Sequence, residues 1–204
     1  IGAMQEKANL FLNGDLDLEW LKNINLSSPI YCADGAFIKI KKLFPNIVAV
    51  IGDLDSLENT NLVDVELVKV SDQNYTDFEK ALEHLLDKFE EIDVYGATGG
   101  QLDHFMGNLS VAKKYKDKVN IVFIEPEQYF FFMKGNTSLN NVLNKTISIL
   151  PFPKIENIKS KGLLFELDHT SLELGDIISV RNKAVSDQIE ITFESGCAIM
   201  FVNN

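Results

Sequence analysis

The segment that most limits the possible folds of this chain is IVAVIGDLDS, at residues 47–56. Its apolar residues, rich in Val and Ile, lead into Gly52, a pattern typical of a buried strand that ends in a tight turn. Asp53 and Asp55 follow at alternate positions, so an extended backbone projects both carboxylates to one side. Adjacent carboxylates repel each other unless a cation lies between them, and oxygen ligands favour Mg²⁺. The alternative is that Asp53 caps the turn and Asp55 is solvated.

Composition limits the class of protein. The 204 residues are 46% hydrophobic and 24% charged, as in a globular protein with a sizeable core. The net charge of −11 argues against nucleic acid as a partner, because most of the surface would repel phosphates. Cys32 and Cys197 lie far apart in the sequence, which indicates free thiols in a reducing cytoplasm. We see no apolar run of membrane-spanning length and no signal peptide, so no membrane partner is expected.

Strands and helices alternate over the first two thirds of the chain, which predicts a mostly parallel sheet covered on both faces. Beyond the segment that ends at Gly52, short apolar runs predict strands at residues 9–12, 30–33, 66–70, 92–95 and 119–124. Helical spacing of apolar residues predicts helices at 17–24, 36–44 and 103–115.

A further helix is expected to begin after Thr76. Thr76 and Glu79 have the spacing of a capping box, and the apolar residues between Phe78 and Phe89 recur at three- and four-residue steps. Asp77 is then the first helical residue, where the helix dipole stabilises its charge. This interaction could be the whole purpose of Asp77.

Acidic and glycine-rich segments follow several of the expected strands, namely Asp34, the pair at 53 and 55, residues 73–77 and residues 96–103. The carboxyl ends of parallel strands share one edge of a sheet, where ligands bind in open α/β folds. Glycines between a strand and a helix let backbone N–H groups approach a phosphate, although this loop is neither a G-x-G-x-x-G motif nor a P-loop. The sequence therefore predicts a ligand site at this edge.

The last third of the chain changes character. Strands are expected at residues 145–150, 177–181, 188–193 and 197–202, and residues 194–196 are interpreted as a hairpin loop. The aromatic run at residues 129–133 is expected to pack in a core. We therefore predict two domains: an α/β domain over 1–134, with a mostly parallel sheet flanked by helices, and an antiparallel β-sandwich over 135–204.

Four ordered motifs carry a resemblance to a known family. They are CADG at residues 32–35, IGDLDS at 51–56, DQNYTD at 72–77 and GATGGQLDH at 96–104. Together they resemble the motif set of thiamine pyrophosphokinases, over most of residues 9–125 and more loosely beyond. The resemblance implies transfer of the pyrophosphoryl group of ATP to the hydroxyl of thiamine, giving thiamine diphosphate and AMP. It also implies Mg²⁺ and ATP as cofactors, a C-terminal domain that binds thiamine, and a homodimer with active sites at the subunit interface.

The resemblance implies roles for individual residues. It places Asp53, Asp55 and Asp77 in catalysis and Mg²⁺ binding, with Asp34 as a further metal ligand or a second acid nearby. ATP and phosphate contacts are expected from Asn13, Gly14, Gly35, Thr98, Gly99, Gly100, Gln101 and Asp103. Substrate contacts are expected from Gln73, Thr76, Ser179, Arg181 and Asn182. If a general base is needed, Asp77 is preferred to His104.

The chain departs from the family pattern at several positions. Gln101 stands where the family often has Arg, and Asn74 stands where an acid is common. Residues 179–182 match the Ser-x-Ser-Asn pattern of the thiamine site only loosely. The only tryptophan is Trp20, so a C-terminal Trp that could stack on thiamine is missing.

Two other functions are compatible with parts of the sequence. Asp53 and Asp55 could be the acidic pair of a haloacid-dehalogenase-like phosphatase, in which an Asp forms an aspartyl-phosphate. Ser56 and Leu57 do not match the usual continuation of that motif. A non-catalytic nucleotide- or thiamine-binding module is the other alternative, and the presence of all the acids argues against it.

Overall fold

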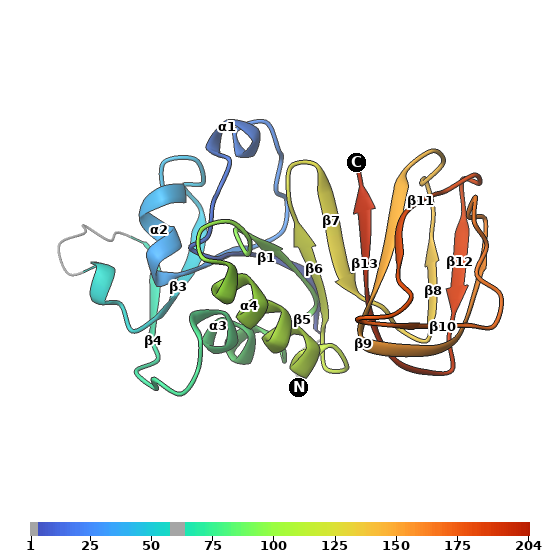
Figure 1. Ribbon diagram of the computed structural model, residues 1–204. Helices are drawn as coiled ribbons and strands as arrows, with labels where there is room; N and C mark the ends of the chain where they lie inside the picture. The colour runs from blue at the N-terminus through green and yellow to red at the C-terminus, as the bar shows by residue number, and fades with distance from the viewer. Residues whose placement is uncertain (1–3, 58–63) are drawn as a thin grey trace. The chain divides into compact units, whose positions relative to one another are not determined.

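The computed structural model describes residues 4–57 and 64–204 (Figure 1). The chain divides into two compact units, Ile1–Pro126 and Glu127–Asn204. This boundary precedes the one expected between residues 134 and 135, because strand β7 (Gln128–Phe132) pairs with strand β13 (Ser195–Asn203) of the second unit. Among the helices of the described residues, none is both long and apolar enough to cross a membrane.

The first unit is built on parallel strands in the order β4-β3-β2-β1-β5-β6 (Figure 1). The strands are β1 (Gln5–Phe11), β2 (Ile30–Ala33), β3 (Ile47–Gly52), β4 (Glu66–Lys69), β5 (Phe89–Tyr95) and β6 (Asn120–Ile124). The helices are α1 (Leu18–Leu21), α2 (Asp34–Ile40), α3 (Asp77–Leu85) and α4 (Leu102–Tyr115), with a 3₁₀ turn η1 at Asp55–Leu57. The predicted α/β architecture is confirmed.

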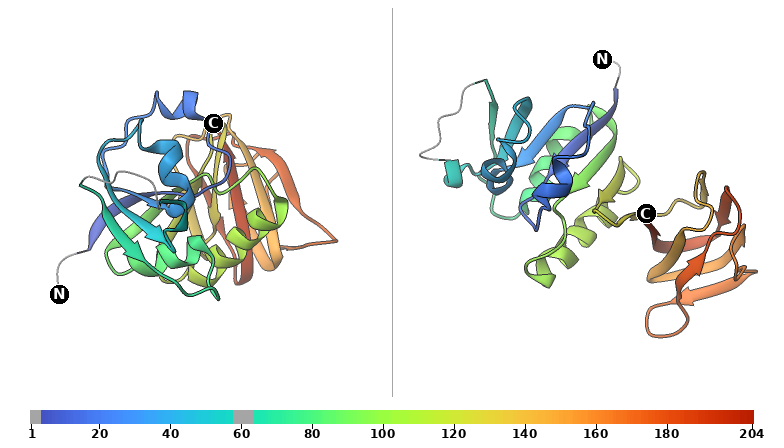
Figure 2. Two further views of the ribbon diagram at one scale, coloured as in Figure 1. Left: turned by 90° about the vertical axis from the view of Figure 1, so that its left-hand side faces the viewer. Right: turned by 90° about the horizontal axis from the view of Figure 1, so that it is seen from above.

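Helices flank both faces of this sheet (Figure 2). On one face, Phe11 and Tyr95 stack with their ring centroids 4.8 Å apart and share a buried cluster with Phe37 of α2. Because strand side chains alternate, the neighbouring Leu10 of β1 points to the opposite face, where it is fully buried. Helices α3 and α4 cover that face. The loops that follow the strands are therefore supported from two sides.

The amino terminus of α3 has the cap that the sequence predicts. The Thr76 hydroxyl accepts a hydrogen bond from the Glu79 backbone N–H at 3.2 Å, and Asp77 is the first helical residue, as the capping pattern predicts. The apolar stripe is buried and comprises Phe78, Ala81, Leu82 and Leu85. This burial fixes which face of α3 turns away from the core.

The second unit consists of antiparallel strands, as expected. They are β7, β8 (Asn136–Leu139), β9 (Thr146–Lys161), β10 (Thr170–Glu173), β11 (Ser179–Lys183), β12 (Ile189–Thr192) and β13. Strand β9 pairs with β10, β11, β12 and β13, whereas β7 pairs with β13 and β8 pairs with β12. The strands enclose a cluster of fully buried aliphatic residues that includes Ile147, Ile149 and Met200.

The hairpin expected around residues 194–196 is wrong. Strands β12 and β13 do not pair with each other, because each of them pairs with a different part of β9. The turn residues pair with β9 as well: Glu194 N–H donates to the Glu156 carbonyl at 3.1 Å. A turn signal marks a change of chain direction, and it does not specify the strand with which the next segment pairs.

A candidate active site at the carboxyl ends of the parallel strands

A cavity of about 650 Å³ lies in the first unit, beside the loops that follow β1, β3 and β5 and beside the start of α3. Its volume is within the range of about 300–1,000 Å³ that is usual for small-molecule sites. It is lined by Leu12, Asn13, Gly14, Asp15, Ala33, Asp53, Gln73, Tyr75, Thr76, Asp77, Phe78, Lys80, Gly96, Ala97, Gly99, Gly100, Gln101, Asp103, His104, Gly107 and Asn108. Most of the segments that the sequence selected therefore meet in one cavity.

The loops after β1 and β5 are joined through their backbones. Gly14 N–H donates to the Gly96 carbonyl at 2.8 Å, and Asp15 N–H donates to the Thr98 carbonyl at 2.9 Å. A Cβ atom at Gly14 would lie 2.3 Å from the Gly96 oxygen and 2.4 Å from the Thr98 oxygen. Glycine is therefore required at position 14 for the two loops to approach this closely.

The ends of β2 and β3 bring two carboxylates into contact. A Cβ atom at Gly52 would lie 2.9 Å from the Asp34 Cβ, so only glycine lets these two strand ends lie so close. The Asp34 side chain, 4% exposed, is hydrogen-bonded to Asp53. Two carboxylates this close repel each other when both are charged, and a cation beside them relieves that repulsion.

Several groups hold the charge on Asp53. Burial on its own raises the pKa of this carboxyl. The hydrogen bonds from Asp34, from the Asp55 backbone N–H and from Gln73 act in the opposite direction, and so does the charge of Lys80. Together they outweigh burial and lower the pKa of Asp53 below its ordinary value of 3.8. Asp53 is therefore ionised at neutral pH.

The first turn of α3 supplies Thr76, Asp77 and Lys80 to the cavity wall. Lys80 Nζ lies 3.6 Å from Asp77 Oδ1, and the lysine side chain is 2% exposed while that of Asp77 is 55% exposed. Residues three apart lie on the same side of a helix, which explains why both reach the cavity. This part of the wall therefore carries an anion and a cation side by side.

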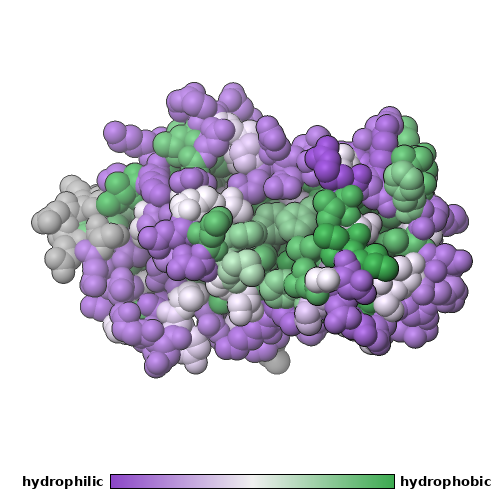
Figure 3. Space-filling model, viewed as in Figure 1, coloured by the Kyte–Doolittle hydropathy of each residue, from purple (hydrophilic) through white to green (hydrophobic). Residues whose placement is uncertain are grey.

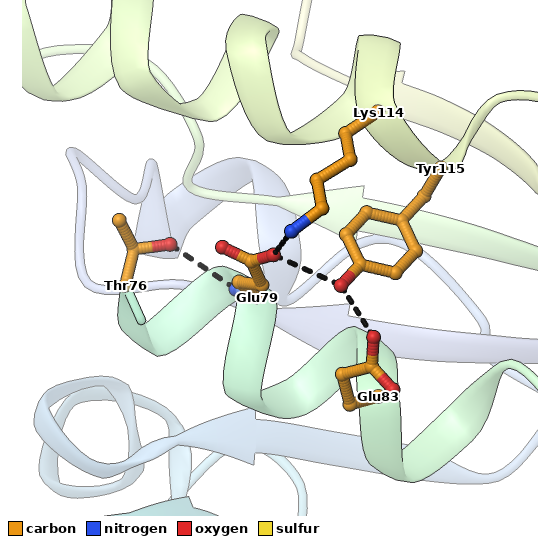
Figure 4. Close-up of polar contacts among 5 residues, drawn as sticks. All are labelled: Thr76, Glu79, Glu83, Lys114 and Tyr115. Carbon is orange, nitrogen blue, oxygen red and sulfur yellow. Dashed lines mark hydrogen bonds and ion pairs between the residues drawn. The ribbon is translucent and has the colours of Figure 1, made fainter. Parts of the chain in front are cut away.

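A polar cluster between α3 and α4 holds this turn in place (Figure 4). Glu79 Oε1 accepts hydrogen bonds from Lys114 Nζ at 2.6 Å and from the Tyr115 hydroxyl at 2.9 Å. The same hydroxyl also contacts Glu83. Burial and the two neighbouring carboxylates raise the pKa of Tyr115, so its hydroxyl remains a donor. Because Glu79 lies between Asp77 and Lys80 in the sequence, this cluster fixes the position of both.

The glycine-rich loop after β5 has the conformation expected for residues without a side chain. Gly99 and Gly100 have φ values of +79° and +62°, which L side chains rarely adopt. Gly100 N–H donates to Asp15 Oδ2 at 3.3 Å, and Asn108 Nδ2 donates to the Ala97 carbonyl at 2.9 Å. The loop leads into α4, whose N-cap residue Gln101 makes no side-chain capping bond. Backbone donors at this end of α4 are therefore placed beside the cavity.

The residues expected at the site fall into three groups. Those that line the cavity are Asn13, Gly14, Asp53, Gln73, Thr76, Asp77, Gly99, Gly100, Gln101 and Asp103. Those outside its lining, although in the same unit, are Asp34, Gly35, Asp55 and Thr98. Across residues 4–57 and 64–204, no group of three or more His, Cys, Asp or Glu side chains has the arrangement of a metal site.

The third group lies in the second unit, on β11, and comprises Ser179, Arg181 and Asn182. Asn182 is buried and its side chain bonds both backbone groups of Phe165, from Phe165 N–H at 3.1 Å and to the Phe165 carbonyl at 2.8 Å. Arg181 is exposed, and its N–H donates to Ser148 Oγ at 2.9 Å. Asn182 therefore holds a loop of its own unit.

Sequence reasoning missed some of the cavity residues. Lys80, Asp15 and Asn108 line the cavity but belong to none of the expected sets. Lys80 could have been found from its spacing, because it follows Asp77 by three residues on a predicted helix. Asp15 and Asn108 carry no such signal, since their positions depend on contacts between loops that are distant in sequence.

Comparison with protein families gives two matches. The family model described as "Thiamin pyrophosphokinase, catalytic domain" matches residues 21–123. The model described as "Thiamin pyrophosphokinase, vitamin B1 binding domain" matches residues 136–198. The first match contains most of the cavity-lining residues, and the second contains β11.

Curated relatives and solved structures carry the same family name. Thiamin pyrophosphokinase 1 of Caenorhabditis elegans is 29% identical over 175 residues, which are 76% of this chain and 71% of that protein. Thiamine pyrophosphokinase of Bacillus subtilis is 27% identical over 164 residues, 75% of this chain and 77% of that protein. The crystal structure of the Bacillus subtilis protein superposes with a TM-score of 0.84 at 21% identity, covering 98% of this chain and 99% of that chain. The yeast thiamin pyrophosphokinase structure has a TM-score of 0.78 at 16% identity, covering 99% of this chain and 87% of that chain.

Proposed function

The chain belongs to the thiamine pyrophosphokinase family, and from this premise we propose that it transfers the pyrophosphoryl group of ATP to the hydroxyl of thiamine in the cavity of the first unit. The products are thiamine diphosphate and AMP. Family membership makes the protein a transferase of thiamine diphosphate biosynthesis. It lends no support to a phosphatase or to a non-catalytic binding module.

The observation that carries the proposal is the composition of the cavity wall. Asp53, Asp77 and the polar Gln73 and Thr76 line the same cavity as the glycine-rich loop of residues 96–100. Carboxylates and helix-terminal N–H groups are the groups that phosphoryl transfer requires, because catalysis there is mostly positioning and neutralisation of charge. The cavity thus combines carboxylates that can bind a metal ion with backbone N–H groups that can bind phosphate.

Mg²⁺ is proposed to be held by Asp53 and Asp77 in the cavity, with Asp34 and Asp55 adjacent. The donor set fits a divalent ion, because all four side chains are carboxylates and the Asp34 side chain is in hydrogen-bond contact with Asp53. When bound, the ion supplies positive charge to the phosphoryl oxygens of ATP. The charge on Asp53, maintained by its hydrogen bonds and by Lys80, keeps that carboxylate available at neutral pH.

The remaining cavity residues bind and orient the substrates. The backbone N–H groups of Gly99 and Gly100 are proposed to contact phosphate, with Asn13, Gly14, Gln101 and Asp103 around the nucleotide. Gly35 and Thr98 would act through the loops that they support. Thr76 and Gln73 are proposed to contact thiamine or the transferred group. Asp77 is the first candidate for a general base, and general-base assistance would contribute about 10²–10⁴-fold.

The second unit is proposed to bind thiamine through Ser179 and Arg181, with Asn182 shaping the adjacent loop. A homodimer with active sites at the subunit interface is also proposed. Apolar side chains reach the surface of this unit (Figure 3), and its exposed large apolar residues include Phe165 at 70% and Ile177 at 55%. Contiguous apolar patches mark faces that another chain covers, so we propose that exposed apolar residues of this unit contribute to the subunit interface. Sedimentation of the purified protein measures the mass of the assembly.

The net charge of −11 still argues against nucleic acid as a partner. The cytoplasm is proposed as the location, since neither of the buried residues Cys32 and Cys197 forms a disulfide.

The test is a direct assay of the purified protein with ATP, thiamine and Mg²⁺. Stoichiometric formation of thiamine diphosphate and AMP is the expected result, and a chelator should abolish it until Mg²⁺ is restored. Release of inorganic phosphate without thiamine diphosphate would instead identify a phosphatase. Binding of ATP or thiamine without any turnover would identify a binding module.

A further inference from the structure

Lys80 is a buried cation in a cavity whose other charged residues are mostly acidic. Its side chain is 2% exposed, although it lines the cavity. Lysine is almost never buried to this extent unless its ammonium group is paired. The cavity is also lined by Asp15, Asp53, Asp77 and Asp103, so the position of Lys80 is not explained by apolar packing alone.

The pairing that the chain offers to Lys80 is incomplete. Within residues 4–57 and 64–204, its ion pair is with Asp77 Oδ1 at 3.6 Å, which is too long for a hydrogen bond. An ammonium group has three N–H donors, and burying them without acceptors is unfavourable. Asp77 is 55% exposed, so its carboxylate does not enclose the ammonium group. The donors of Lys80 are thus available to an acceptor inside the cavity.

The location of Lys80 indicates which acceptor fits. It lies in the first turns of α3, on the same side as Asp77, and its charge acts on Asp53. If Asp53 and Asp77 hold a divalent ion, phosphate groups bound beside that ion lie within reach of Lys80. The positive end of the helix dipole adds to the attraction for an anion.

We propose that Lys80 Nζ donates hydrogen bonds to the non-bridging oxygens of the pyrophosphoryl group that is transferred, which makes Lys80 a catalytic residue. This proposal rests on the proposed function. The lysine retains its protons and forms no covalent bond. It contacts the β- and γ-phosphate groups of ATP while the thiamine hydroxyl oxygen forms a bond to the β-phosphorus and the bond from that phosphorus to the α-phosphate oxygen breaks. AMP leaves with this oxygen, and the hydroxyl proton passes to the general base, for which Asp77 is the first candidate. The helix that carries Lys80 is held against α4 by the hydrogen bonds of Glu79 with Lys114 and Tyr115 (Figure 4).

The test compares Lys80→Met, Lys80→Arg and the control Lys42→Met. Lys42 is exposed in the same unit and does not line the cavity. Binding of magnesium pyrophosphate, Mg–ATP and adenosine is measured by titration calorimetry. Lys80→Met is expected to weaken the binding of magnesium pyrophosphate and of Mg–ATP about 10²-fold, as the loss of hydrogen bonds between an ammonium group and phosphate oxygens does. Adenosine affinity should change less than about threefold, because adenosine lacks the phosphates. Lys80→Arg should recover most of the affinity, and Lys42→Met should match the wild type.

Other results would overturn the proposal. An equal loss for adenosine and pyrophosphate would show that the lysine only maintains the shape of the cavity, and unchanged pyrophosphate binding would show that it does not contact phosphate. Should Lys80→Met not fold, Lys80→Gln is tested in the same way. If neither neutral variant folds, Lys80 is a structural residue and the proposal fails.

The proposed function is tested separately by the wild-type assay. A wild-type protein that makes no thiamine diphosphate, yet binds pyrophosphate in a Lys80-dependent manner, would reject the function and retain the phosphate contact. Full thiamine diphosphate synthesis by Lys80→Met, with an unchanged KM for Mg–ATP, would reject the contact and retain the function.

Discussion

The Tyr115 hydroxyl of α4 lies 2.9 Å from Glu79 Oε1 of α3, with both side chains buried. This hydrogen bond, drawn in Figure 4, joins α4 to the first turns of α3, which also carry Asp77 and Lys80. The contact is remote in sequence, since the residues are 36 positions apart. It therefore links the stability of the helix pair to the geometry of the cavity wall.

Tyr115→Phe should lower the free energy of unfolding by about 1–3 kcal/mol, because Glu79 loses a buried donor to a charged group. Urea denaturation measures the change. Tyr129→Phe is the matched control: this residue is half-buried in the second unit, and its hydroxyl has no hydrogen bond to the described residues. A loss in Tyr115→Phe no larger than in the control would show that the contact with Glu79 is energetically neutral.

Asp53→Asn should reduce turnover at least about 10²-fold while the protein still folds, since losing a carboxylate that binds metal costs more than losing an outer partner. The steady-state rate of AMP formation and the circular dichroism spectrum are the two measurements. Asp117→Asn removes an 83% exposed carboxylate that pairs with Lys116 and should leave the rate unchanged. Turnover of Asp53→Asn close to that of Asp117→Asn would contradict the metal assignment.

Gly14→Ala should destabilise the first unit by about 1–3 kcal/mol and weaken ATP binding, because the added methyl group meets two carbonyl oxygens of the loop after β5. Thermal unfolding and ATP titration report the two effects. Gly135→Ala serves as the control, since a Cβ atom there would lie 3.6 Å from its nearest neighbour, the Phe193 oxygen. If both variants unfold at the same temperature, the two loops are not held together as described.

Asp93 gives a prediction of pH dependence. Burial raises its pKa above the ordinary value of 3.8, although a hydrogen bond from Lys7 at 3.0 Å opposes the shift, and Asp93 Oδ1 has no partner among the described residues. The folded state therefore binds this proton more tightly than the unfolded state, so Asp93 costs stability as the pH rises above 3.8.

Asp93→Asn removes this titration. Urea unfolding of both proteins is measured between pH 3 and pH 8. The free energy of unfolding of Asp93→Asn, relative to that of the wild type, should increase as the pH rises from 3. Lys7 stays charged over this range, so its own titration does not interfere. A difference between the two proteins that is independent of pH would mean that the Asp93 carboxyl titrates alike in the folded and unfolded states.

Local signals in the sequence predicted the elements that depend on neighbouring residues. Thr76 specifies the start of α3, because its hydroxyl accepts the N–H of Glu79 three residues on; the other half of the capping box is replaced, since the Glu79 carboxylate bonds Lys114 and Tyr115. The run that ends at Gly52 specifies β3, and the alternation of strands and helices brings the strand ends to one edge. The family match then confirmed the function that the four motifs implied.

Features that depend on distant contacts could not be predicted in this way. Expected residues 145–150 are only the first part of β9, which runs to Lys161, because its length is set by the strands that pair with it. Asp15 reaches Gly100 across 85 residues of sequence. The three-residue spacing from Asp77 predicts the side of α3 on which Lys80 lies, but it does not predict its burial: a lysine on a helix is normally solvated, and the loops around Lys80 are what cover it.

Strand β9 is the common neighbour of β10, β11, β12 and β13. A segment with partners along both edges cannot fray from either side, so its amide hydrogens exchange with solvent only when the whole second unit opens. The slowest-exchanging amides of that unit are accordingly expected at Ile147, Ile149 and Ile155, which β13 flanks on one edge and β11 or β10 on the other, and their exchange rate reports how often the unit unfolds as a single body.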